Sequence, residues 1–338
     1  MEILDSTLEE AARCTPGNSS TMQAAVLAGP RRIRLQETNI PQPAARQVRV
    51  RIEGCGICGS NLAPWEGRPW FEYPFAPGGP GHEGWGIVDE IGPEVTKVST
   101  GQRVALLSYQ AFAEYDVAEE DCIVPLPEEL EGQPFPGEAL GCAYNVFRRS
   151  DIQAGQQVAV VGVGFLGAIL VALAAKSGAR VIAISRRKCP LEIAKQFGAQ
   201  SVIAWDTPSE VGRRVMERTG GRGCERVIEA AGAQATLDLS TEICAERGRL
   251  IIAGYHQDGL RQVKMQLWNW RGLDVINAHE RDPRVYVEGM RLAAQAVARG
   301  EFDPSPLYTH RFGLAEIGNG FAALEARPSG FIKGIITI

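Results

Sequence analysis

The chain has 338 residues, enough for about two domains with substantial hydrophobic cores, and this length excludes a small disulfide-held scaffold. Its 35 Lys and Arg against 40 Asp and Glu give a formal charge of −5. No basic block that could follow a phosphate backbone occurs, so nucleic acid is not an expected partner. With 45% hydrophobic and 22% charged residues, the composition is typical of a soluble globular protein.

The eight cysteines do not form the pattern of a disulfide framework, and the start of the chain shows no apolar signal segment. We therefore expect reduced thiols and a cytoplasmic location. The segment from Val158 to Ala175 is 18 residues without a charge, which is the lower edge of a membrane span. Its clustered glycines favour a strand, a turn and a buried helix instead. A membrane is therefore not an expected partner.

Residues 1–21 are polar and carry a Ser/Thr run, so we expect a flexible N-terminal extension. From Met22 to about Arg149, short alternating apolar runs such as QVRVRIEG and GWGIVDEIG are broken by Gly and Pro, as in a β-rich domain. From about Ser150 to Arg284, strand patterns alternate with helix patterns, from QVAVVGVG to RLIIAGY. This alternation predicts a doubly wound parallel sheet.

The remainder of the chain contains an amphipathic helix, VYVEGMRLAAQAVARG, a second helix, LAEIGNGFAALE, and a terminal strand, FIKGIITI. We expect residues 22–148 and 285–338 to form the β-rich domain and residues 149–284 to form the parallel domain. The predicted fold class is therefore α/β, with a doubly wound sheet beside a β-rich domain.

A dinucleotide-binding motif opens the parallel domain. The run Gly162-Val163-Gly164-Phe165-Leu166-Gly167 satisfies G-x-G-x-x-G, follows the strand VAVV and opens a helix. In a Rossmann domain the first glycine makes the turn, the second lets the backbone approach a pyrophosphate, and the third packs helix on strand. The anion then lies at the helix N-terminus. The alternative is a Gly-rich turn that holds no ligand.

The end of the next strand bears on which dinucleotide binds. An NAD site carries Asp or Glu there to accept from the ribose hydroxyls, but this strand ends in Ser185-Arg186-Arg187. A hydroxyl and guanidinium groups suit a 2′-phosphate, so NADP(H) is favoured over NAD(H). The alternative is a solvated run of charges continuing into Lys188.

A metal site is the best interpretation of three separate residues. The pair Cys55 and Cys58 has CxxC spacing, but no second CxxC follows to complete a structural zinc site. Cys58, His82 and Glu138 are three ligand types that Zn²⁺ accepts, and they leave a fourth position open, as catalytic zinc sites do. Each also has an ordinary alternative: a buried thiol, a turn histidine and a carboxylate at a helix N-terminus.

From Met22 to Ile338 the sequence resembles the zinc-dependent medium-chain alcohol and polyol dehydrogenases. The segments that carry the resemblance are GCGICGSN (54–61), GHEGWGIVDEIG (81–92), GQRVA (101–105), GEALGCAYNVF (137–147), the dinucleotide motif, LYTHRFGLAEIGNGFAAL and FIKGIITI. The resemblance implies that the β-rich domain is GroES-like and catalytic. It assigns the zinc ligands to Cys58, His82 and Glu138, with Glu83 as a possible transient fourth ligand.

The sequence departs from the family pattern in two places. The four-cysteine lobe that often follows the GQRVA strand is missing, so we expect one catalytic zinc per chain and no structural zinc. Asn61 stands where the family usually has Asp, and Leu62-Ala63-Pro64 lacks the histidine of the proton relay. Ser60 keeps the first relay hydroxyl, so the proton is expected to leave through Ser60 and the cofactor ribose.

The resemblance also suggests further contacts. Lys333 is expected on the pyrophosphate and Tyr255 at the cofactor. Cys142 is expected either near the nicotinamide or as a small buried hydrophobic residue. Independently of the resemblance, ligands of such sheets bind at the carboxyl ends of the parallel strands, so the substrate pocket is expected to use residues from several loops, namely Trp65, Trp70, Tyr109, Tyr255, His256, Asn277 and His279. The alternative for His256 and His279 is an ordinary hydrogen-bonded loop histidine.

Association of subunits is expected as well. The family forms dimers or dimers of dimers through edge strands, for which GLDVINAH (272–279) is the candidate here, and Trp268 and Trp270 are expected at the interface. A homodimer or homotetramer is therefore predicted.

Together these features predict hydride transfer between NADP(H) and a secondary alcohol, polyol or cyclitol, or the matching ketone. Polar side chains in the expected pocket favour a hydroxylated substrate over a plain alkyl alcohol. Two alternatives share the fold: a zinc-free NADPH-dependent quinone or enone reductase, and an NADPH-binding protein without catalytic activity.

Overall fold

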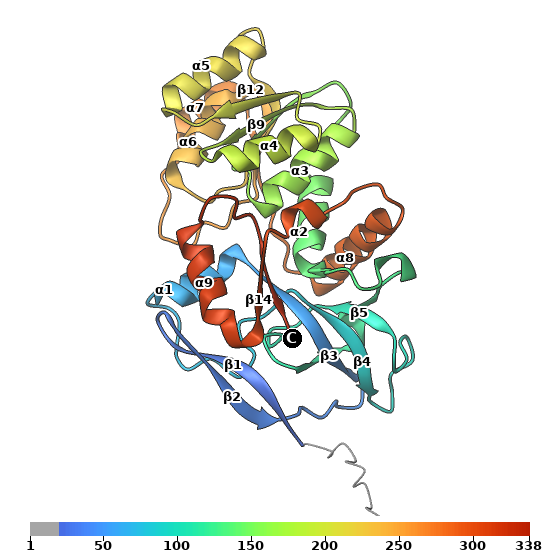
Figure 1. Ribbon diagram of the computed structural model, residues 1–338. Coiled ribbons are helices and arrows are strands. Elements are labelled where there is room, and N and C mark those ends of the chain that lie inside the picture. Colours follow the sequence, from blue (N-terminus) through green and yellow to red (C-terminus); the bar gives the residue numbers. More distant parts are fainter. Residues whose placement is uncertain (1–19) are drawn as a thin grey trace, which may run out of the picture.

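The structure is a computed structural model that describes residues 20–338 (Figure 1). Of the predicted N-terminal extension, residues 1–19 lie outside the described part. Thr21, which the sequence analysis placed in the extension, instead opens strand β1 and pairs with Asn39.

The β-rich part contains a hairpin and a seven-stranded mixed sheet. The hairpin consists of β1 (Thr21–Gly29) and β2 (Arg32–Asn39). The larger sheet has the order β14 (His310–Gly313), β15 (Gly334–Thr337), β3 (Gln47–Ile57), β4 (Gly84–Ile91), β5 (Arg103–Leu106) and β7 (Ile123–Pro125), with β6 (Tyr115–Glu119) also paired to β3. The last strand of the chain, β15, therefore lies beside β3, so the C-terminal segment is built into the same sheet as the N-terminal strands.

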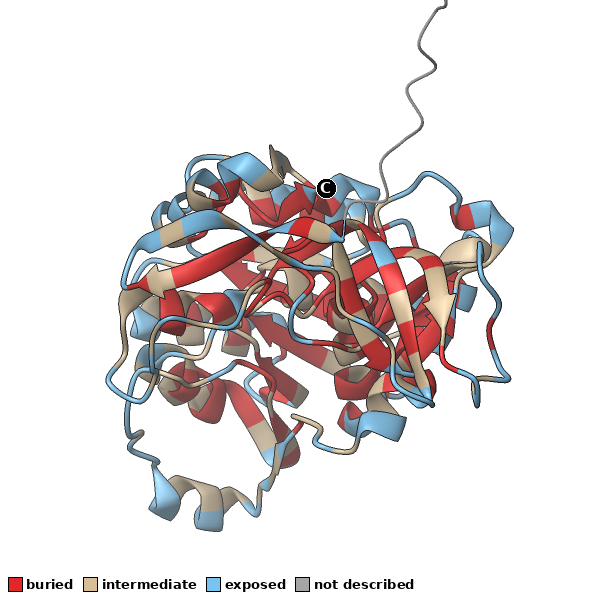
Figure 2. Cartoon of the chain, turned by 90° about the horizontal axis from the view of Figure 1, so that it is seen from below, coloured by how far each residue is buried: buried red, intermediate tan, exposed pale blue. Residues whose placement is uncertain are grey.

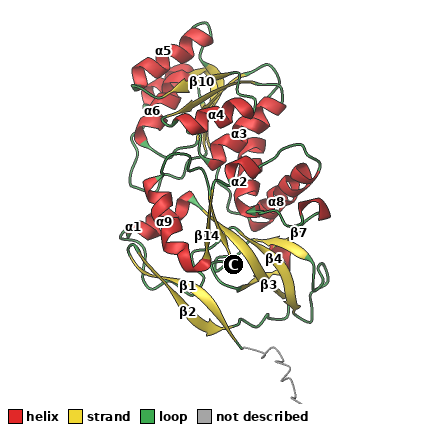
Figure 3. Ribbon diagram, viewed as in Figure 1, coloured by secondary structure: helices red, strands yellow, loops and turns green. Residues whose placement is uncertain are grey.

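The other part is the predicted doubly wound sheet, and this prediction is confirmed. Six parallel strands have the order β10 (Ser201–Ala204), β9 (Arg180–Ser185), β8 (Gln157–Val161), β11 (Cys224–Glu229), β12 (Cys244–Ile252) and β13 (Asp274–Asn277). The helices that connect and cover them are α3 (Phe165–Lys176), α4 (Lys188–Gln196), α5 (Pro208–Arg218), α6 (Gln234–Ile243) and α7 (Met265–Arg271) (Figure 3). The strand order reverses between β8 and β11, which is where such sheets bind ligands at their carboxyl ends.

The uncharged segment from Val158 to Ala175 is divided between β8 and α3, as its glycines predicted. Among residues 20–338, no helix is both long enough and apolar enough to cross a membrane.

Two helices join the parts. α2 (Gly137–Ser150) packs along α8 (Pro283–Ala298) with Gly141 and Gly289 at the crossing. A Cβ on Gly289 would come within 2.7 Å of the Gly141 carbonyl oxygen, so the absence of side chains permits this close approach. The predicted domain limits at 148/149 and 284/285 stay predictions, and they fall within these two helices.

The hydrophobic core is continuous across both parts. One cluster of buried residues includes Trp85 and Ala105 of the mixed sheet, Leu140 of α2, Met290 of α8 and Val160 of the parallel sheet. Figure 2 shows buried residues concentrated in the strands and inner helices, with exposed residues on the outer loops. The other helices that the site uses are η1 (Gly59–Asn61), α1 (Leu62–Glu66) and α9 (Ile317–Ala326).

Candidate active site

Three potential metal ligands converge at the ends of two paired strands. Cys58 follows β3, while His82 and Glu83 precede β4, and Cys55 of β3 pairs with Gly84 of β4. One sulfur, nitrogen and oxygen atom from Cys58, His82 and Glu83 all lie within 4.8 Å of one another. In the part of the chain that the structure describes, no other set of three His, Cys, Asp or Glu residues gathers in this way.

Glu138 belongs to the same neighbourhood without being part of that group. It lies in the first turn of α2, and its Oε1 accepts from Cys142 Sγ, one turn further on, at 3.1 Å. Burial raises the pKa of the Glu138 carboxyl, and the charge of Glu83 adds to this, while His82 opposes it. The predicted ligand set of Cys58, His82 and Glu138 thus stays a prediction, since it is Glu83 that completes the tightest group.

The charges in this cluster call for a cation. Burial lowers the pKa of His82, but the negative charges of Cys58, Glu138 and Glu83 outweigh burial and raise this pKa to about 10. Sulfur, imidazole nitrogen and carboxylate oxygen are the ligands that Zn²⁺ accepts in proteins. The donor set therefore fits a zinc ion.

A buried ion pair adjoins the cluster. The ammonium of Lys333 lies 2.6 Å from Glu83 Oε1, and both residues are buried, at 4% and 0% exposure. Burial lowers the pKa of Lys333, but Glu83, Cys58 and Glu138 raise it above its usual value. The same ammonium lies 4.7 Å from the centre of the Phe165 ring in the dinucleotide motif. Lys333 thus connects the ligand cluster to that motif, and its expected pyrophosphate contact stays a prediction.

Asn61 holds two ligands in place. Its Oδ1 accepts from the backbone N–H of Cys58 at 2.9 Å, and its Nδ2 donates to the Pro80 carbonyl at 3.0 Å. His82 Nδ1 donates to the same carbonyl at 2.9 Å. Because a carbonyl only accepts, Nδ1 carries a hydrogen and Nε2 is the atom available to a metal. Sequence analysis noted Asn61 only as a departure from the family pattern.

Ser60 lies where the predicted proton route begins. Its Oγ is 3.4 Å from His82 Nε2, on the side of the imidazole that faces the ligand cluster. Ala63 and Pro64 stand in the stretch that lacks the relay histidine, and both are buried in α1.

The three glycines of the dinucleotide motif occupy three different environments. Gly162 has a φ of +104°, which side chains rarely allow. A Cβ on Gly167 would lie 2.0 Å from the Gly162 carbonyl oxygen, whereas a Cβ on Gly164 would meet no atom within 4 Å. These environments suit the expected roles of turn, ligand approach and helix packing, with Phe165 and Leu166 opening α3 beside Gly164.

The end of β9 carries the residues expected to bind the 2′-phosphate of the cofactor. Ser185 is 8% exposed, and its Oγ accepts from the backbone N–H of Arg187 at 3.3 Å. The Arg187 guanidinium donates to the Phe331 carbonyl, while Arg186 is exposed. Among residues 20–338, neither arginine forms an ion pair with a carboxylate.

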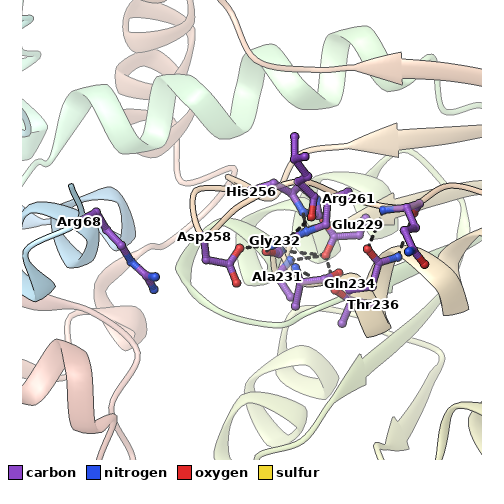
Figure 4. Close-up of polar contacts among 12 residues, drawn as sticks. Arg68, Glu229, Ala231, Gly232, Gln234, Thr236, His256, Asp258 and Arg261 are labelled. Carbon is purple, nitrogen blue, oxygen red and sulfur yellow. Dashed lines mark hydrogen bonds and ion pairs between the residues drawn. The ribbon is translucent and has the colours of Figure 1, made fainter. Parts of the chain in front are cut away.

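A polar network holds the loop after β12 (Figure 4). Buried Glu229, at the end of β11, accepts from Gly232 N–H at 2.8 Å, Thr236 Oγ1 at 2.6 Å and His256 Nε2 at 3.0 Å. Burial raises the pKa of Glu229, but these donors lower it below its usual value. Arg261 Nε donates to His256 Nδ1 at 2.8 Å. Both nitrogens of His256 are therefore engaged within the protein, as in an ordinary hydrogen-bonded loop histidine, and its expected role in the substrate pocket stays a prediction.

Sequence reasoning missed Glu229 and Arg261. The available signal was a glutamate at the end of a parallel strand followed by Ala-Ala-Gly, where backbone N–H groups converge on one carboxylate.

A cavity of about 300 Å³ lies beside this network and is lined by Trp70, Phe71, Tyr255, His256, Gln257 and Gly259. Trp70 and Tyr255 are exposed, as a pocket lining requires, and the Tyr109 ring lies 6.4 Å from that of His82. His279 lies next to the Tyr255 ring, at 5.7 Å between ring centres.

Trp65 does not lie in the expected pocket, whereas the interface expected at Trp268 and Trp270 stays a prediction. Trp65 is 5% exposed, its Nε1 donates to Glu325 at 2.8 Å, and it packs on Phe321 in the core, so it does not line the pocket. Trp268 donates to Thr241 Oγ1 at 3.1 Å and packs on the core of its own chain, whereas Trp270 is 83% exposed. Of the two rings, that of Trp270 is the more accessible to solvent.

Comparison with known proteins gives a consistent result. Residues 44–128 match the family described as alcohol dehydrogenase GroES-like domain, and residues 166–295 match zinc-binding dehydrogenase. Human sorbitol dehydrogenase is 28% identical over 363 residues, covering 96% of each chain. An alcohol dehydrogenase of Rhizobium meliloti is 30% identical over 251 residues, which are 65% of this chain and 73% of the relative. A solved structure from Sinorhizobium meliloti 1021, described as a zinc-binding dehydrogenase bound to NADP, has a TM-score of 0.81 at 25% identity and covers 95% of this chain and 100% of that chain.

The different surroundings of Gly164 and Gly167 give a first prediction. Gly167→Ala should destabilise the fold by about 1–3 kcal/mol, because the new methyl group overlaps the Gly162 carbonyl. Gly164→Ala should leave stability nearly unchanged and weaken dinucleotide binding, because the methyl group occupies the space for the pyrophosphate. Chemical denaturation and fluorescence titration with NADPH measure the two effects. Equal losses of stability in both variants would contradict this division of roles.

The hydrogen bonds of Asn61 give a second prediction. Asn61→Ala should lower zinc affinity about 10–100-fold, because the Cys58 backbone and the Pro80 carbonyl lose their shared anchor. Competition with a chromogenic zinc chelator measures this. Asn145→Ala is the matched control, since it also removes a buried asparagine, whose Nδ2 donates to Val285 in the α2–α8 contact, but away from the ligands. Zinc affinity that falls equally in both variants would mean that Asn61 acts only through general packing.

Proposed function

Because the chain belongs to the zinc-dependent medium-chain dehydrogenase family, we propose that it transfers a hydride between NADP(H) and a secondary alcohol, polyol or cyclitol, or the matching ketone. The observation that carries this proposal is the group of Cys58, His82 and Glu83, tied through Lys333 to the dinucleotide motif. One buried lysine contacts both the ligand cluster and the dinucleotide motif, which suits a reaction that uses a metal ion and a dinucleotide together.

In this proposal Cys58, His82 and Glu138 hold one zinc ion per chain. Glu83 is already neutralised by Lys333, whereas Glu138 has only the Cys142 thiol as a donor, so Glu138 is the carboxylate better able to balance a metal charge. The proposed fourth-ligand role of Glu83 would require it to leave Lys333. When bound, zinc polarises the substrate oxygen and lowers the pKa of an alcohol.

The chain's own residues position the reactants and move the proton. Ser60 Oγ lies beside the ligand cluster and exchanges the proton of the reacting oxygen, and the cofactor ribose carries it onward because α1 offers no histidine. Gly164 and the N–H groups opening α3, at Phe165 and Leu166, receive the pyrophosphate. The cofactor supplies the hydride chemistry, and the protein supplies position and charge.

The end of β9 supports NADP(H) over NAD(H). Ser185, Arg186 and Arg187 offer a hydroxyl and two guanidinium groups, and no carboxylate stands there to repel a 2′-phosphate. The pocket between Trp70 and Tyr255 combines aromatic surface with the amide of Gln257, which suits the hydroxyl-bearing remainder of a polyol or cyclitol.

We also propose that the chain forms a homodimer or homotetramer in the cytoplasm. β13 is an edge strand of the parallel sheet, within the predicted stretch 272–279, and exposed Trp270 lies on α7 just before it. A paired edge would cover the unsatisfied backbone groups of β13.

The metal assignment is tested by analysis of purified protein and by two matched variants. The parent protein should hold one zinc per chain and change nicotinamide absorbance with NADP⁺ across a panel of secondary alcohols, sugar alcohols and inositols. Glu138→Gln should lose zinc on dialysis. Glu83→Gln should unfold at a lower temperature, because Lys333 is left buried without its partner, but should retain zinc while it is folded.

Two results would change this proposal. Active protein without zinc would favour the quinone or enone reductase alternative, and zinc-loaded protein that binds NADPH but transfers no hydride to any carbonyl or from any alcohol would favour the non-catalytic one. If folded Glu83→Gln loses zinc and Glu138→Gln keeps it, Glu83 is the zinc ligand and Glu138 is not.

The cofactor preference is tested at the end of β9. Replacing Arg186 and Arg187 together by Ala should lower affinity for NADP⁺ about 10–100-fold while leaving NAD⁺ affinity nearly unchanged, because two charge-assisted hydrogen bonds to the phosphate are lost. Lys188→Ala is the control, since it is a neighbouring exposed cation that pairs only with Glu192. An unchanged ratio of the two affinities would remove the assignment.

A further inference from the structure

The turn that follows α9 lies against the end of β9, although the two are far apart in sequence. α9 ends at Ala326 and is capped by Arg327, whose φ of +46° turns the chain sharply. The segment that follows reaches the parallel sheet (Figure 1), where the Arg187 guanidinium donates to the Phe331 carbonyl across 144 residues of sequence. The C-terminal segment is therefore a neighbour of the predicted 2′-phosphate site.

This arrangement brings a third guanidinium group to the site. Burial lowers the pKa of Arg187 and of Arg327; the charge of Arg327 lowers that of Arg187 further, and the charge of Arg186 lowers that of Arg327. The geometry of the chain agrees, because the Phe331 N–H donates to the Pro328 carbonyl at 3.0 Å and so closes a tight turn directly after Arg327. This turn places Arg327 next to the residue whose carbonyl Arg187 binds, so guanidinium groups from two separate segments of the chain lie near one another.

No carboxylate balances these charges. Within residues 20–338, none of the three arginines has an ion pair with Asp or Glu. Glu325, two residues before Arg327, is engaged by Arg31 and Trp65 and accepts from both. Guanidinium groups gathered without a counter-charge repel one another, so the arrangement suits an anionic ligand.

We propose that Arg327 is a third cationic group for the 2′-phosphate of the cofactor, acting with Ser185, Arg186 and Arg187. The inference rests on the proposed preference for NADP(H), and it adds a specificity residue from the C-terminal segment. A phosphate monoester carries a charge of about −1.5 to −2 near neutral pH, so a third guanidinium strengthens its binding. The end of the second strand of the nucleotide-binding half is where the 2′ position of the ribose lies in this fold.

The proposed site joins the end of β9 to the C-terminal segment. Arg327 lies six residues before Lys333, whose ammonium holds Glu83 beside the ligand cluster. A phosphate bound between the β9 end and Arg327 therefore fixes the same C-terminal segment that carries Lys333.

The test uses a ligand that needs neither zinc nor turnover. Isothermal titration calorimetry compares 2′,5′-ADP, which carries the 2′-phosphate without nicotinamide, with 5′-AMP, which lacks it. Arg327→Gln should weaken binding of 2′,5′-ADP about tenfold or more and leave 5′-AMP binding unchanged. Arg327→Lys should restore part of the loss, and the salt dependence of 2′,5′-ADP binding should become less steep in Arg327→Gln.

Arg311→Gln is the matched control, because Arg311 is an exposed arginine of the same C-terminal segment, in β14. Thermal unfolding of both variants checks that the fold persists. If Arg327→Gln binds 2′,5′-ADP as tightly as the parent protein, Arg327 is not part of the site. If the parent protein itself binds 2′,5′-ADP no more tightly than 5′-AMP, the NADP preference fails and this inference fails with it, whereas absent turnover alone would affect only the proposed reaction.

Discussion

The buried ion pair between Lys333 and Glu83 is the contact on which the arrangement of the site depends. Charges removed from water are costly unless they are paired, so two side chains at 4% and 0% exposure hold each other in place. They are 250 residues apart, and the pairing of β15 with β3 brings them together. The residue just before the last strand thus lies against the ligand cluster. The ring of Phe165, in the dinucleotide motif, packs against the same ammonium.

Charge balance organises the rest of the cluster. Cys58, Glu83 and Glu138 place negative charge around the imidazole of His82. The ammonium of Lys333 neutralises only part of this charge. A proton on His82, whose pKa is raised to about 10, supplies further positive charge, and a zinc ion would take the place of that proton. The network below the ligands is uncharged by contrast: the amide of Asn61 and the Pro80 carbonyl orient Cys58 and His82 without adding charge. At Asn61 the chain therefore positions these ligands through neutral hydrogen bonds.

The sequence predicted the parts of the molecule that depend on local pattern. Alternating strand and helix periods predicted the parallel sheet, and the spacing from Gly162 to Gly167 predicted the turn whose glycines meet three different environments. What it missed depends on contacts between distant segments. Trp65 looked like a pocket residue because aromatic residues often line pockets, but Glu325 and Phe321 of α9 hold it in the core. For His256 the sequence left a pocket residue and a hydrogen-bonded loop histidine open, because Glu229, which accepts from its Nε2, lies at the end of another strand, β11.

The contacts between the two parts of the chain fall next to the residues that a hydride transfer would need. Gln257 Nε2, in the loop after β12, donates to the Gly59 carbonyl at 3.2 Å, and Gly59 stands between Cys58 and Ser60. On the other side, the Arg187 guanidinium holds Phe331, two residues before Lys333. Because hydride transfer requires the reacting atoms to be aligned closely, contacts at these positions matter more than contacts elsewhere on the surface. Two loops of the parallel sheet, those after β9 and β12, thus contact segments that adjoin the ligand cluster, and a shift of one part of the chain relative to the other would disturb both contacts.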